Sequence, residues 1–303
     1  MEQIQQCPNC NSKNLANYLT AQDRHYGNKG AFSTAICKHC GLIFMNPMPN
    51  NVELASFYPP ATYYSFHESI QNQQSAFKQK LFKLLCINFP THDPAFALPG
   101  RIVDIGCGNG YSLTAYKKAG WEVYGVEPSE VAAQIGNENG LNIFCGTLDE
   151  AKFPDNHFDY IRSNHSFEHI NNPNETLAEM KRVLKVGGKV FIGVPNSSGA
   201  VAKIFKKFWY YLGLPVHTFN YNPNTLSEML TKHGFNVEKI YYNSTWAGIL
   251  GSLQVYLYRN TTKLSSDGFF FKVKLFKPLA GAMARILNLL KTGDCIEIIA
   301  SKK

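Results

Sequence analysis

The feature that most constrains the fold is an alternation of short apolar strands with helical segments, which begins at residue 101 and runs to the end of the chain. The segments "RIVDI", "WEVYGVE", "FDYIRSN" and "KVFIGVPN" each have the length and apolar content of a buried strand. Helical patterns separate them, as in residues 111–120 and 129–140. Short strands that alternate with helices predict an α/β fold around a mostly parallel sheet.

A glycine-rich turn follows the first of these strands, in "DIGCGNG". Gly106, Gly108 and Gly110 allow a tight turn and let the backbone approach a ligand closely. A nicotinamide site would favour G-x-G-x-x-G with a pyrophosphate at the helix N-terminus, but here the third glycine comes one place early. The Asp104 carboxylate would repel a pyrophosphate, and it suits a ligand with a cationic amino-acid end. Glu127 closes the next strand, where an acid can accept hydrogen bonds from ribose hydroxyls.

The pattern D-x-G-x-G-x-G, followed by an acid after the next strand, resembles that of class I S-adenosylmethionine-dependent methyltransferases. Two later blocks, "FPDNHFDYIRSNHSFEHI" and "EMKRVLKVGGKVFIGVPN", are similar to the fourth strand and to the helix-turn-strand of that family. The resemblance covers roughly residues 100–243 and the last strand. It implies a Rossmann-like, seven-stranded methyltransferase sheet that binds S-adenosylmethionine.

The resemblance also assigns roles to single residues. It implies that Glu127 holds the ribose, that Leu148 lies beside the adenine, and that Asn164 lies near the amino-acid end of the cofactor. Thr147 stands where the family often has an aspartate, so the adenine lacks that acidic contact. The residues expected to wrap the methionine part are Asp104, Gly106, Cys107, Gly108 and Gly110.

Two histidines are the candidates for chemistry at the acceptor. His169, in "FEHI" after the fourth strand, lies where the family faces its substrate, and a histidine can take the proton of a hydroxyl. His217, in "GLPVHTFNY", belongs to a region that commonly closes over the substrate in this family. A capping or backbone-orienting role is the alternative for His169. His165 is a weaker candidate.

The cysteines predict a metal site. The pairs Cys7/Cys10 and Cys37/Cys40 each have C-x-x-C spacing, which lets two thiolates share one tetrahedral zinc ion. Disulfides within each pair are the alternative, but this cysteine usage is typical of a reducing, cytoplasmic protein. Four thiolates leave no open position, so the zinc is expected to be structural. An N-terminal zinc-ribbon module followed by "FYPPATYY" resembles a group of bacterial methyltransferases that act on sugars, glycolipids or other small metabolites.

These features predict three parts. Residues 1–50 form a loop-rich zinc-ribbon module, and residues 51–99 form a linker and lid with an amphipathic helix at 74–89. Residues 100–303 form the methyltransferase domain, with a helical insertion at about 244–293. The N-terminus is polar and lacks a signal peptide, and the uncharged run at 240–258 holds too many polar residues to favour a membrane span.

The charge leaves the partner open. The net charge of +8 is compatible with nucleic acid, a membrane surface or an anionic substrate. Basic and apolar residues are mixed in residues 76–85, 202–214 and 269–290, a pattern of lid helices or of peripheral membrane contact with a lipid-linked acceptor. We expect O-methylation of a small-molecule acceptor.

Two other functions remain as alternatives. An RNA methyltransferase is disfavoured because the zinc segment has few basic residues and no aromatic-basic platform is seen. A zinc-dependent binding protein with a vestigial cofactor fold is disfavoured by the intact Asp104 and glycines.

Overall fold

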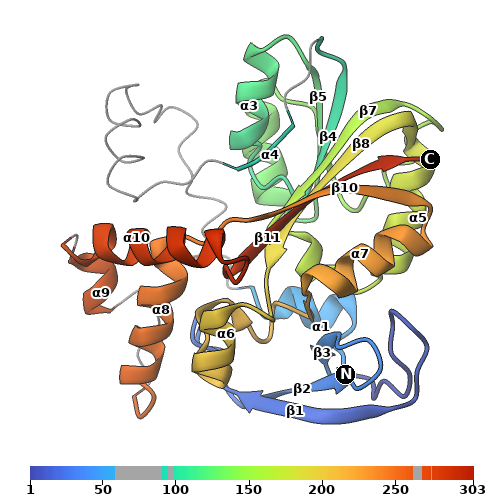
Figure 1. Ribbon diagram of the computed structural model, residues 1–303. Helices are drawn as coiled ribbons and strands as arrows, with labels where there is room; N and C mark the ends of the chain where they lie inside the picture. The colour runs from blue at the N-terminus through green and yellow to red at the C-terminus, as the bar shows by residue number, and fades with distance from the viewer. Residues whose placement is uncertain (59–90, 95–97, 262–267, 274) are drawn as a thin grey trace.

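The computed structural model describes the whole chain except residues 59–90, 95–97, 262–267 and 274. The amphipathic helix predicted at 74–89 therefore lies outside the described residues. The described part contains a seven-stranded sheet and a smaller four-stranded sheet (Figure 1).

The large sheet confirms the predicted Rossmann-like fold class. Its order is β10-β11-β8-β7-β4-β5-β6, and β11 is the strand that runs antiparallel to its neighbours. The strands, in chain order, are β4 (Arg101–Ile105), β5 (Glu122–Glu127), β6 (Ile143–Cys145), β7 (Phe158–Asn164), β8 (Leu184–Pro195), β10 (Phe235–Tyr242) and β11 (Cys295–Lys302).

The strand order reverses between β4 and β7, and this places the site. The chain passes from β4 outward through β5 to β6, and then returns to β7 on the other side of β4. In open α/β sheets, ligands bind in the crevice at the carboxyl ends of the strands where the order reverses. The glycine-rich turn after β4 and the segment after β7 therefore lie at one place.

Local sequence signals set the helices. Ser129 caps α4 (Glu130–Glu138), and its side chain accepts a hydrogen bond from the Ala132 backbone. Asn222 and Thr225 form a capping box at α7 (Pro223–Lys232), which has a proline in its first turn. The glycine-rich turn leads directly into α3 (Tyr111–Lys118), and α5 (Pro173–Val183) follows β7. These helices pack on the strands of the large sheet.

Alternate residues of β4 enter the apolar packing on the two faces of the sheet. Ile102 packs in a cluster with Trp121 and Tyr160, whereas Val103 belongs to a larger cluster that includes Phe44. The larger cluster joins the N-terminal sheet to the large sheet. The two sheets consequently share one continuous core.

The N-terminal segment is more ordered than the loop-rich module that the sequence predicts. It forms β1 (Leu15–Ala21), β2 (Phe32–Cys37) and β3 (Ile43–Met45), followed by the short helix α1 (Asn51–Ser56). A fourth strand, β9 (Phe219–Asn220), comes from a distant part of the chain and pairs antiparallel with β3. Single-sequence reasoning missed β9 because a two-residue strand has no periodic pattern.

Helices also lie before β9 and between the last two strands. Before β9 lie α6 (Ala200–Phe205) and the 3-10 turns η3 (Lys206–Phe208) and η4 (Tyr210–Leu212). Between β10 and β11 lie α8 (Trp246–Leu257), α9 (Phe269–Lys272) and α10 (Phe276–Leu289). Across the described residues, no helix combines the length and the apolar character that a membrane crossing requires.

One predicted boundary is wrong. The sequence predicts that the helix after residue 172 continues to a glycine stop at Gly187, but α5 ends at Val183 and β8 begins at Leu184. Gly187 lies inside β8 with a positive φ of 74°. Extended pairing with β7, which begins at Leu184 opposite Phe158, prevails over the helical pattern of the sequence.

Candidate functional site

The glycine-rich turn needs glycine for two measurable reasons. Gly106, Gly108 and Gly110 have φ values of 68°, 57° and 76°, in the left-handed region that residues with a Cβ rarely adopt. A Cβ on Gly106 would also lie 2.4 Å from Cβ of Ser166, and a Cβ on Gly110 would lie 2.3 Å from Cδ1 of Leu141. The turn is therefore a cradle of bare backbone at the carboxyl end of β4.

Asp104 is buried at the end of β4, and a cation of the chain faces it. The Arg162 guanidinium, on β7, donates to its carboxylate at 2.7 Å, and the Ser112 hydroxyl donates at 3.1 Å. Burial raises the pKa of the Asp104 carboxyl, while Arg162 and Ser112 act in the opposite direction. Arg162 also pairs with Asp93 at 3.3 Å. Sequence reasoning did not identify Arg162 as the partner of Asp104. A direct contact of Asp104 with the cofactor stays a prediction.

Glu127 lies at the glycine-rich turn, as its place after β5 predicts. Its carboxylate accepts hydrogen bonds from the backbone N–H of Gly108 at 2.8 Å and of Ser129 at 2.9 Å. Burial raises the pKa of this carboxyl, and the two N–H groups lower it. Each carboxylate oxygen can accept a further hydrogen bond, which leaves capacity for a ribose hydroxyl.

The other expected cofactor residues lie at neighbouring strand ends. Leu148 is buried in the turn after β6, and Cys107, within the glycine-rich turn, is also buried. Asn164 ends β7, and its Oδ1 atom is buried without a hydrogen-bond partner among the described residues. The cradle, the acid after β5 and the unpartnered amide oxygen fit a ligand that carries ribose hydroxyls and an ammonium group. These residues could hold S-adenosylmethionine.

The four paired cysteines come together in the N-terminal sheet. All four are free thiols, and their Sγ atoms lie within 4.8 Å of one another. The shortest separations, 3.5 Å, join Cys7 to Cys40 and Cys10 to Cys37, across the pairs rather than within them. Tetrahedral zinc with Zn–S bonds of about 2.3 Å places its sulfurs about 3.8 Å apart. The donor set and its spacing therefore fit zinc.

Both cysteine pairs are built on the same turn. The Cys7 carbonyl accepts from Asn11 N–H, and the Cys37 carbonyl accepts from Gly41 N–H, each at 2.9 Å. Asn11 and Gly41 both have positive φ. The pKa of the Cys37 thiol is lowered to about 7: burial raises it, but N–H groups of the turn and neighbouring thiols lower it. Burial raises the pKa of Cys7, which occupies the same place in the other turn, and of Cys40, so of these three thiols Cys37 is the one shifted toward the thiolate that binds a metal.

The predicted catalytic histidines, His169 and His217, lie together although 48 positions separate them in the sequence. Their rings meet edge to face, with centroids 4.6 Å apart. Glu168, which sequence reasoning missed, lies beside them on the 3-10 turn η2 (Phe167–His169). A ring nitrogen of each histidine and a carboxylate oxygen of Glu168 lie within 4.8 Å of one another. We call these three residues the Glu/His cluster.

Backbone carbonyls orient both rings of the Glu/His cluster. Nδ1 of His169 lies 2.9 Å from the Val216 carbonyl and 2.8 Å from the Tyr58 hydroxyl. Nδ1 of His217 lies 3.0 Å from the Tyr211 carbonyl. Burial lowers the pKa of both histidines, and that of His217 falls to about 3 with His169 as a second cause. Both rings are therefore neutral at physiological pH.

His165 lies at the edge of the Glu/His cluster. Its Nδ1 is 3.6 Å from Oε1 of Glu168, and its side chain is 40% exposed. Its ring also stacks on Tyr211, with centroids 6.5 Å apart, so it lies beside the Glu/His cluster and outside it. Tyr63 and Tyr64, the last two residues of the segment "FYPPATYY", lie outside the described residues.

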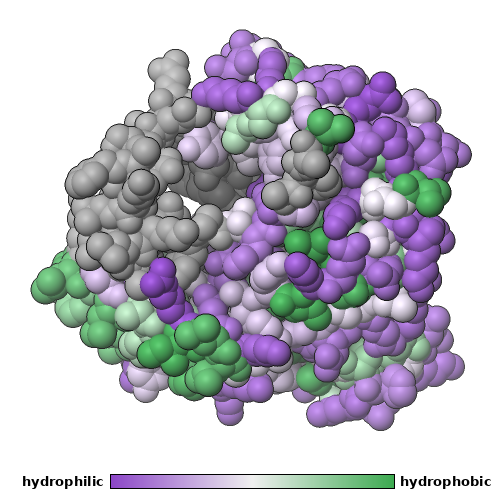
Figure 2. Space-filling model, turned by 45° about the horizontal axis from the view of Figure 1, so that its top comes forward, coloured by the Kyte–Doolittle hydropathy of each residue, from purple (hydrophilic) through white to green (hydrophobic). Residues whose placement is uncertain are grey.

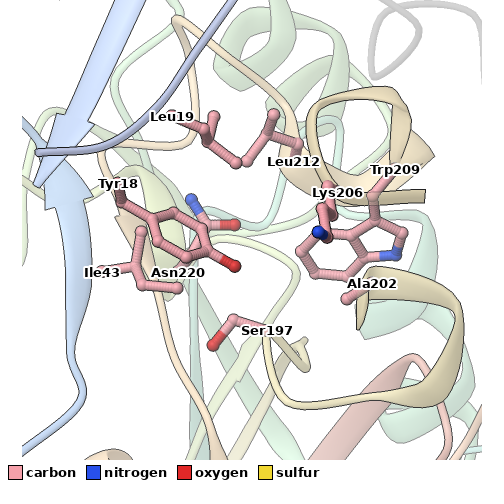
Figure 3. Close-up of a pocket in the computed structure, with 9 residues that line it drawn as sticks. All are labelled: Tyr18, Leu19, Ile43, Ser197, Ala202, Lys206, Trp209, Leu212 and Asn220. Atoms are coloured by element: carbon pink, nitrogen blue, oxygen red, sulfur yellow. The ribbon is translucent and has the colours of Figure 1, made fainter. Parts of the chain in front are cut away.

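A small pocket lies at the junction of the N-terminal sheet with α6 and the turns that follow it (Figure 3). The Asn220 side chain enters it beside Tyr18, with Trp209 and Lys206 across from it. Both amide atoms of Asn220 are buried without a partner among the described residues. None of the predicted site residues lines this pocket, so it is separate from the Glu/His cluster and the glycine-rich turn.

Comparisons with known proteins agree with this geometry. A family model described as a methyltransferase domain matches residues 73–240, more than half of the chain. An uncharacterized protein of Methanocaldococcus jannaschii is 31% identical over 108 residues, which are 36% of this chain and 51% of that protein. A ubiquinone biosynthesis O-methyltransferase of Saccharophagus degradans is 26% identical over 154 residues, 46% of this chain and 65% of that enzyme. The chain thus spans only about half to two thirds of the length of these relatives.

Solved structures share the fold. The [4+2]-cyclase SpnF matches with a TM-score of 0.51 and 16% identity over 84% of this chain and 97% of that chain. A methyltransferase from Archaeoglobus fulgidus matches with a TM-score of 0.49 and 22% identity, over 79% of this chain and 97% of that chain. Because a fold can host unrelated chemistries, the match to the cyclase establishes the architecture alone.

Proposed function

The chain belongs to the family of class I S-adenosylmethionine-dependent methyltransferases, and on that premise we propose that it methylates a hydroxyl of a sugar, glycolipid or other small metabolite. The observation that carries the proposal is the cradle at the end of β4, where three left-handed glycines meet the Glu127 carboxylate. Asn164, whose amide oxygen is unpartnered among the described residues and lies against Gly193 of β8, ends the neighbouring strand β7. S-adenosylmethionine supplies an electrophilic methyl group on a sulfonium. The acceptor oxygen forms the new bond, the carbon–sulfur bond breaks with its electron pair left on sulfur, and the acceptor loses a proton.

The two halves of the site would divide this work. The cradle binds and orients the cofactor, and orientation of the reacting atoms contributes much of the rate enhancement in an in-line displacement. The Glu/His cluster follows β7 and begins four residues after Asn164. We assign His169 and His217 to the acceptor side, where they orient the hydroxyl and receive its proton directly or through water. The names of several relatives as O-methyltransferases support a hydroxyl acceptor.

Methyl transfer is tested with S-adenosylmethionine that carries a deuterated methyl group. Purified protein is incubated with this donor and with fractionated polar and lipid extracts, and mass spectrometry detects molecules that gain the label. We expect labelled, hydroxyl-bearing products with the wild type and none with Gly106→Val, which fills the cradle. No labelled product from any fraction, in a protein that binds the donor, would contradict the proposal.

The zinc proposal follows from the four thiolates. We assign Cys7, Cys10, Cys37 and Cys40 to one structural zinc ion, because four thiolates close its coordination shell. The ion would hold the N-terminal sheet together, and through β9 it would support the loop that carries His217. Elemental analysis of protein purified without added metal tests this assignment.

Peripheral membrane contact is proposed on the outer face of α10. Leu275 and Leu289, at the two ends of this helix, are 79% and 83% exposed, and Leu279 is 66% exposed. The sequence from 246 to 293 holds seven lysines and arginines and one acid, Asp267. Figure 2 shows apolar residues gathered on the side of the molecule where α8–α10 lie. An exposed apolar stripe on a basic segment suits an anionic lipid surface.

Vesicle co-sedimentation tests this surface. We expect the wild type to bind vesicles that contain anionic lipid and to be released by salt. Leu279→Gln should weaken binding severalfold, whereas Val186→Gln, at an equally exposed position on β8, should not. Equal binding to neutral and anionic vesicles, or equal loss in both variants, would refute the membrane surface.

A further inference from the structure

We propose that Glu168, His169 and His217 bind a second divalent metal ion, distinct from the ion in the four-cysteine site. The ligand set, two imidazoles and one carboxylate, suits borderline transition ions such as zinc, iron(II), cobalt(II) or manganese(II). The proposal concerns binding, and it goes beyond the methyl-transfer function, since an ion can bind here whether or not the protein transfers methyl groups.

The distances are close to those of a metal site. Nε2 of His217 lies 4.0 Å from Oε1 of Glu168, and one ring nitrogen of each histidine and one carboxylate oxygen of Glu168 lie within 4.8 Å of one another. Ligands bound to one zinc at about 2.0–2.2 Å lie roughly 3.3 Å from one another. An ion at the centre would therefore draw each ligand inward by less than about 1 Å, which a side-chain adjustment can provide.

The hydrogen bonds of the histidines favour a proton on Nδ1 of each ring. A backbone carbonyl can only accept, so a proton on Nδ1 of His217 satisfies the Tyr211 carbonyl. A proton on Nδ1 of His169 satisfies the Val216 carbonyl, and the Tyr58 hydroxyl oxygen then accepts from the same N–H. Nε2 of each ring is then the nitrogen that keeps a lone pair. Such a bond from the far nitrogen to a carbonyl is the arrangement that orients metal-bound histidines.

The Glu168 carboxylate supplies a second, independent observation. The residue is 1% exposed, and its Oε2 atom has no hydrogen-bond partner among the described residues. In the described part of the chain, its ion-pair contacts are with histidines, at 3.6 Å to His165 and 4.0 Å to His217, and no lysine or arginine reaches it. A buried carboxylate without a cation is costly, and a bound divalent ion would remove that cost.

The site would be open, unlike the four-cysteine site. Three protein ligands leave at least one coordination position for water or an acceptor, and both histidines are partly exposed. An ion here would hold a hydroxyl-bearing acceptor beside the cofactor cradle and make that hydroxyl more acidic. His169 and His217 would then act as metal ligands rather than as proton acceptors, and the proton of the acceptor hydroxyl would pass to water.

Cobalt titration of the protein as purified, with its zinc retained, tests the proposal. We expect wild type to bind one equivalent of Co2+ with the weak d–d absorption of nitrogen and oxygen ligands and without thiolate charge-transfer bands. Glu168→Gln and His217→Asn should each weaken this binding at least a hundredfold. His233→Asn is the matched control, because His233 also bonds through Nδ1 to a carbonyl, that of Met229, but lies outside the cluster.

Each outcome decides the question. Failure of the folded wild type to bind Co2+ at millimolar concentration would overturn the proposal, whatever the variants do. So would binding that survives both substitutions, or binding that is lost equally in His233→Asn. Thermal unfolding of each variant checks that it is folded, and Glu168→Gln, which preserves shape, decides the result if His217→Asn does not fold. Labelled methyl transfer without Co2+ binding would leave the proposed function intact and reject the metal site.

Discussion

The cofactor side and the acceptor side of this site are built in different ways. The cradle and its acid come from Asp104 to Glu127, a continuous stretch of 24 residues in one strand-helix-strand unit. The acceptor side brings together Tyr58, Glu168 and His217 from three distant segments, and its last strand, β9, completes the N-terminal sheet. The cofactor side can therefore form within the large sheet alone, whereas the acceptor side depends on the N-terminal segment.

This difference has a physical consequence for the two halves. The backbone of Met45 in β3 donates to the Thr218 carbonyl at 2.8 Å, next to His217. The Asn9 side chain contacts Glu228 on α7, and the Lys232 ammonium donates to the Asn9 carbonyl. Loss of structure at the four-cysteine site should therefore disturb the acceptor side more than the cradle.

The largest expected effect is that of Cys37→Ser. Loss of one thiolate should release the zinc and destabilise the N-terminal sheet by about 5 kcal/mol or more, since structural zinc contributes folding energy directly. Thermal unfolding measures this loss, with Cys145→Ser, an exposed free thiol, as the matched control. We expect S-adenosylmethionine affinity to stay within about threefold of wild type, on the scale of 1.4 kcal/mol per factor of ten. A parallel loss of cofactor affinity would show that the two sides are not separable.

The next effect is the pH dependence of stability that Asp294 contributes. This residue immediately precedes β11, and its carboxyl group faces Trp209. Burial raises the pKa of its carboxyl to about 7, although Trp209 acts in the opposite direction. The groups that face it are Trp209, Tyr211, Cys295 and the backbone of Gly248. Because the folded pKa lies above the unfolded value of about 3.9, this group's contribution is fully present at low pH and is lost as pH rises through about 7.

That loss amounts to about 4 kcal/mol, from a shift of about three pKa units. Asp294→Asn keeps the neutral form at every pH, so it should stabilise the protein by about 4 kcal/mol at about pH 8 and by about 1.5 kcal/mol at about pH 5, because the loss in wild type begins at the unfolded pKa of about 3.9. Asp155→Asn, at an exposed carboxylate, is the control. If the unfolding temperature of Asp294→Asn changes between the two pH values as much as that of wild type does, the assignment is contradicted.

A smaller effect is expected on the cofactor side from Asp104→Asn. The substitution leaves the buried Arg162 with Asp93 as its remaining carboxylate, which should cost about 3 kcal/mol of stability. It should also weaken S-adenosylmethionine binding at least tenfold, about 1.4 kcal/mol. Asp159→Asn is the control, because Asp159 pairs with Lys185 at the other end of the strands. Cofactor affinity that matches wild type in folded protein would remove Asp104 from the cofactor side.

The sequence predicts the cofactor side well because its signals are local. Strand β4 ends where "RIVDI" ends, the three glycines have the positive φ that a glycine-rich turn requires, and Glu127 reaches the turn. Each C-x-x-C turn is likewise set by residues a few positions apart. The contact between the two pairs joins Cys10 to Cys37, 27 positions away, and was predicted from the zinc ion that the pairs would share.

The acceptor side could not be predicted to the same depth. The histidines were candidates one by one, but their contact depends on the path of the chain through α6, η4 and β9. The position of Glu168 next to His169 in "FEHI" was the one indication in the sequence that it belongs to the site. A sequence does not reveal that an acid will be buried with an unpartnered carboxylate oxygen. The role of Arg162 could not be predicted either, because its partners Asp104 and Asp93 come from other segments of the chain.

The most direct test of this account is a calorimetric titration of S-adenosylmethionine into three proteins: the wild type, Gly106→Val and His217→Asn. The valine would clash with Ser166 inside the cradle, whereas His217 lies on the acceptor side. We predict one equivalent bound with nearly equal affinity in the wild type and in His217→Asn, and no binding in folded Gly106→Val. Absence of binding in the wild type, or equal affinity in all three proteins, would contradict the claim that the glycine-rich turn holds the cofactor.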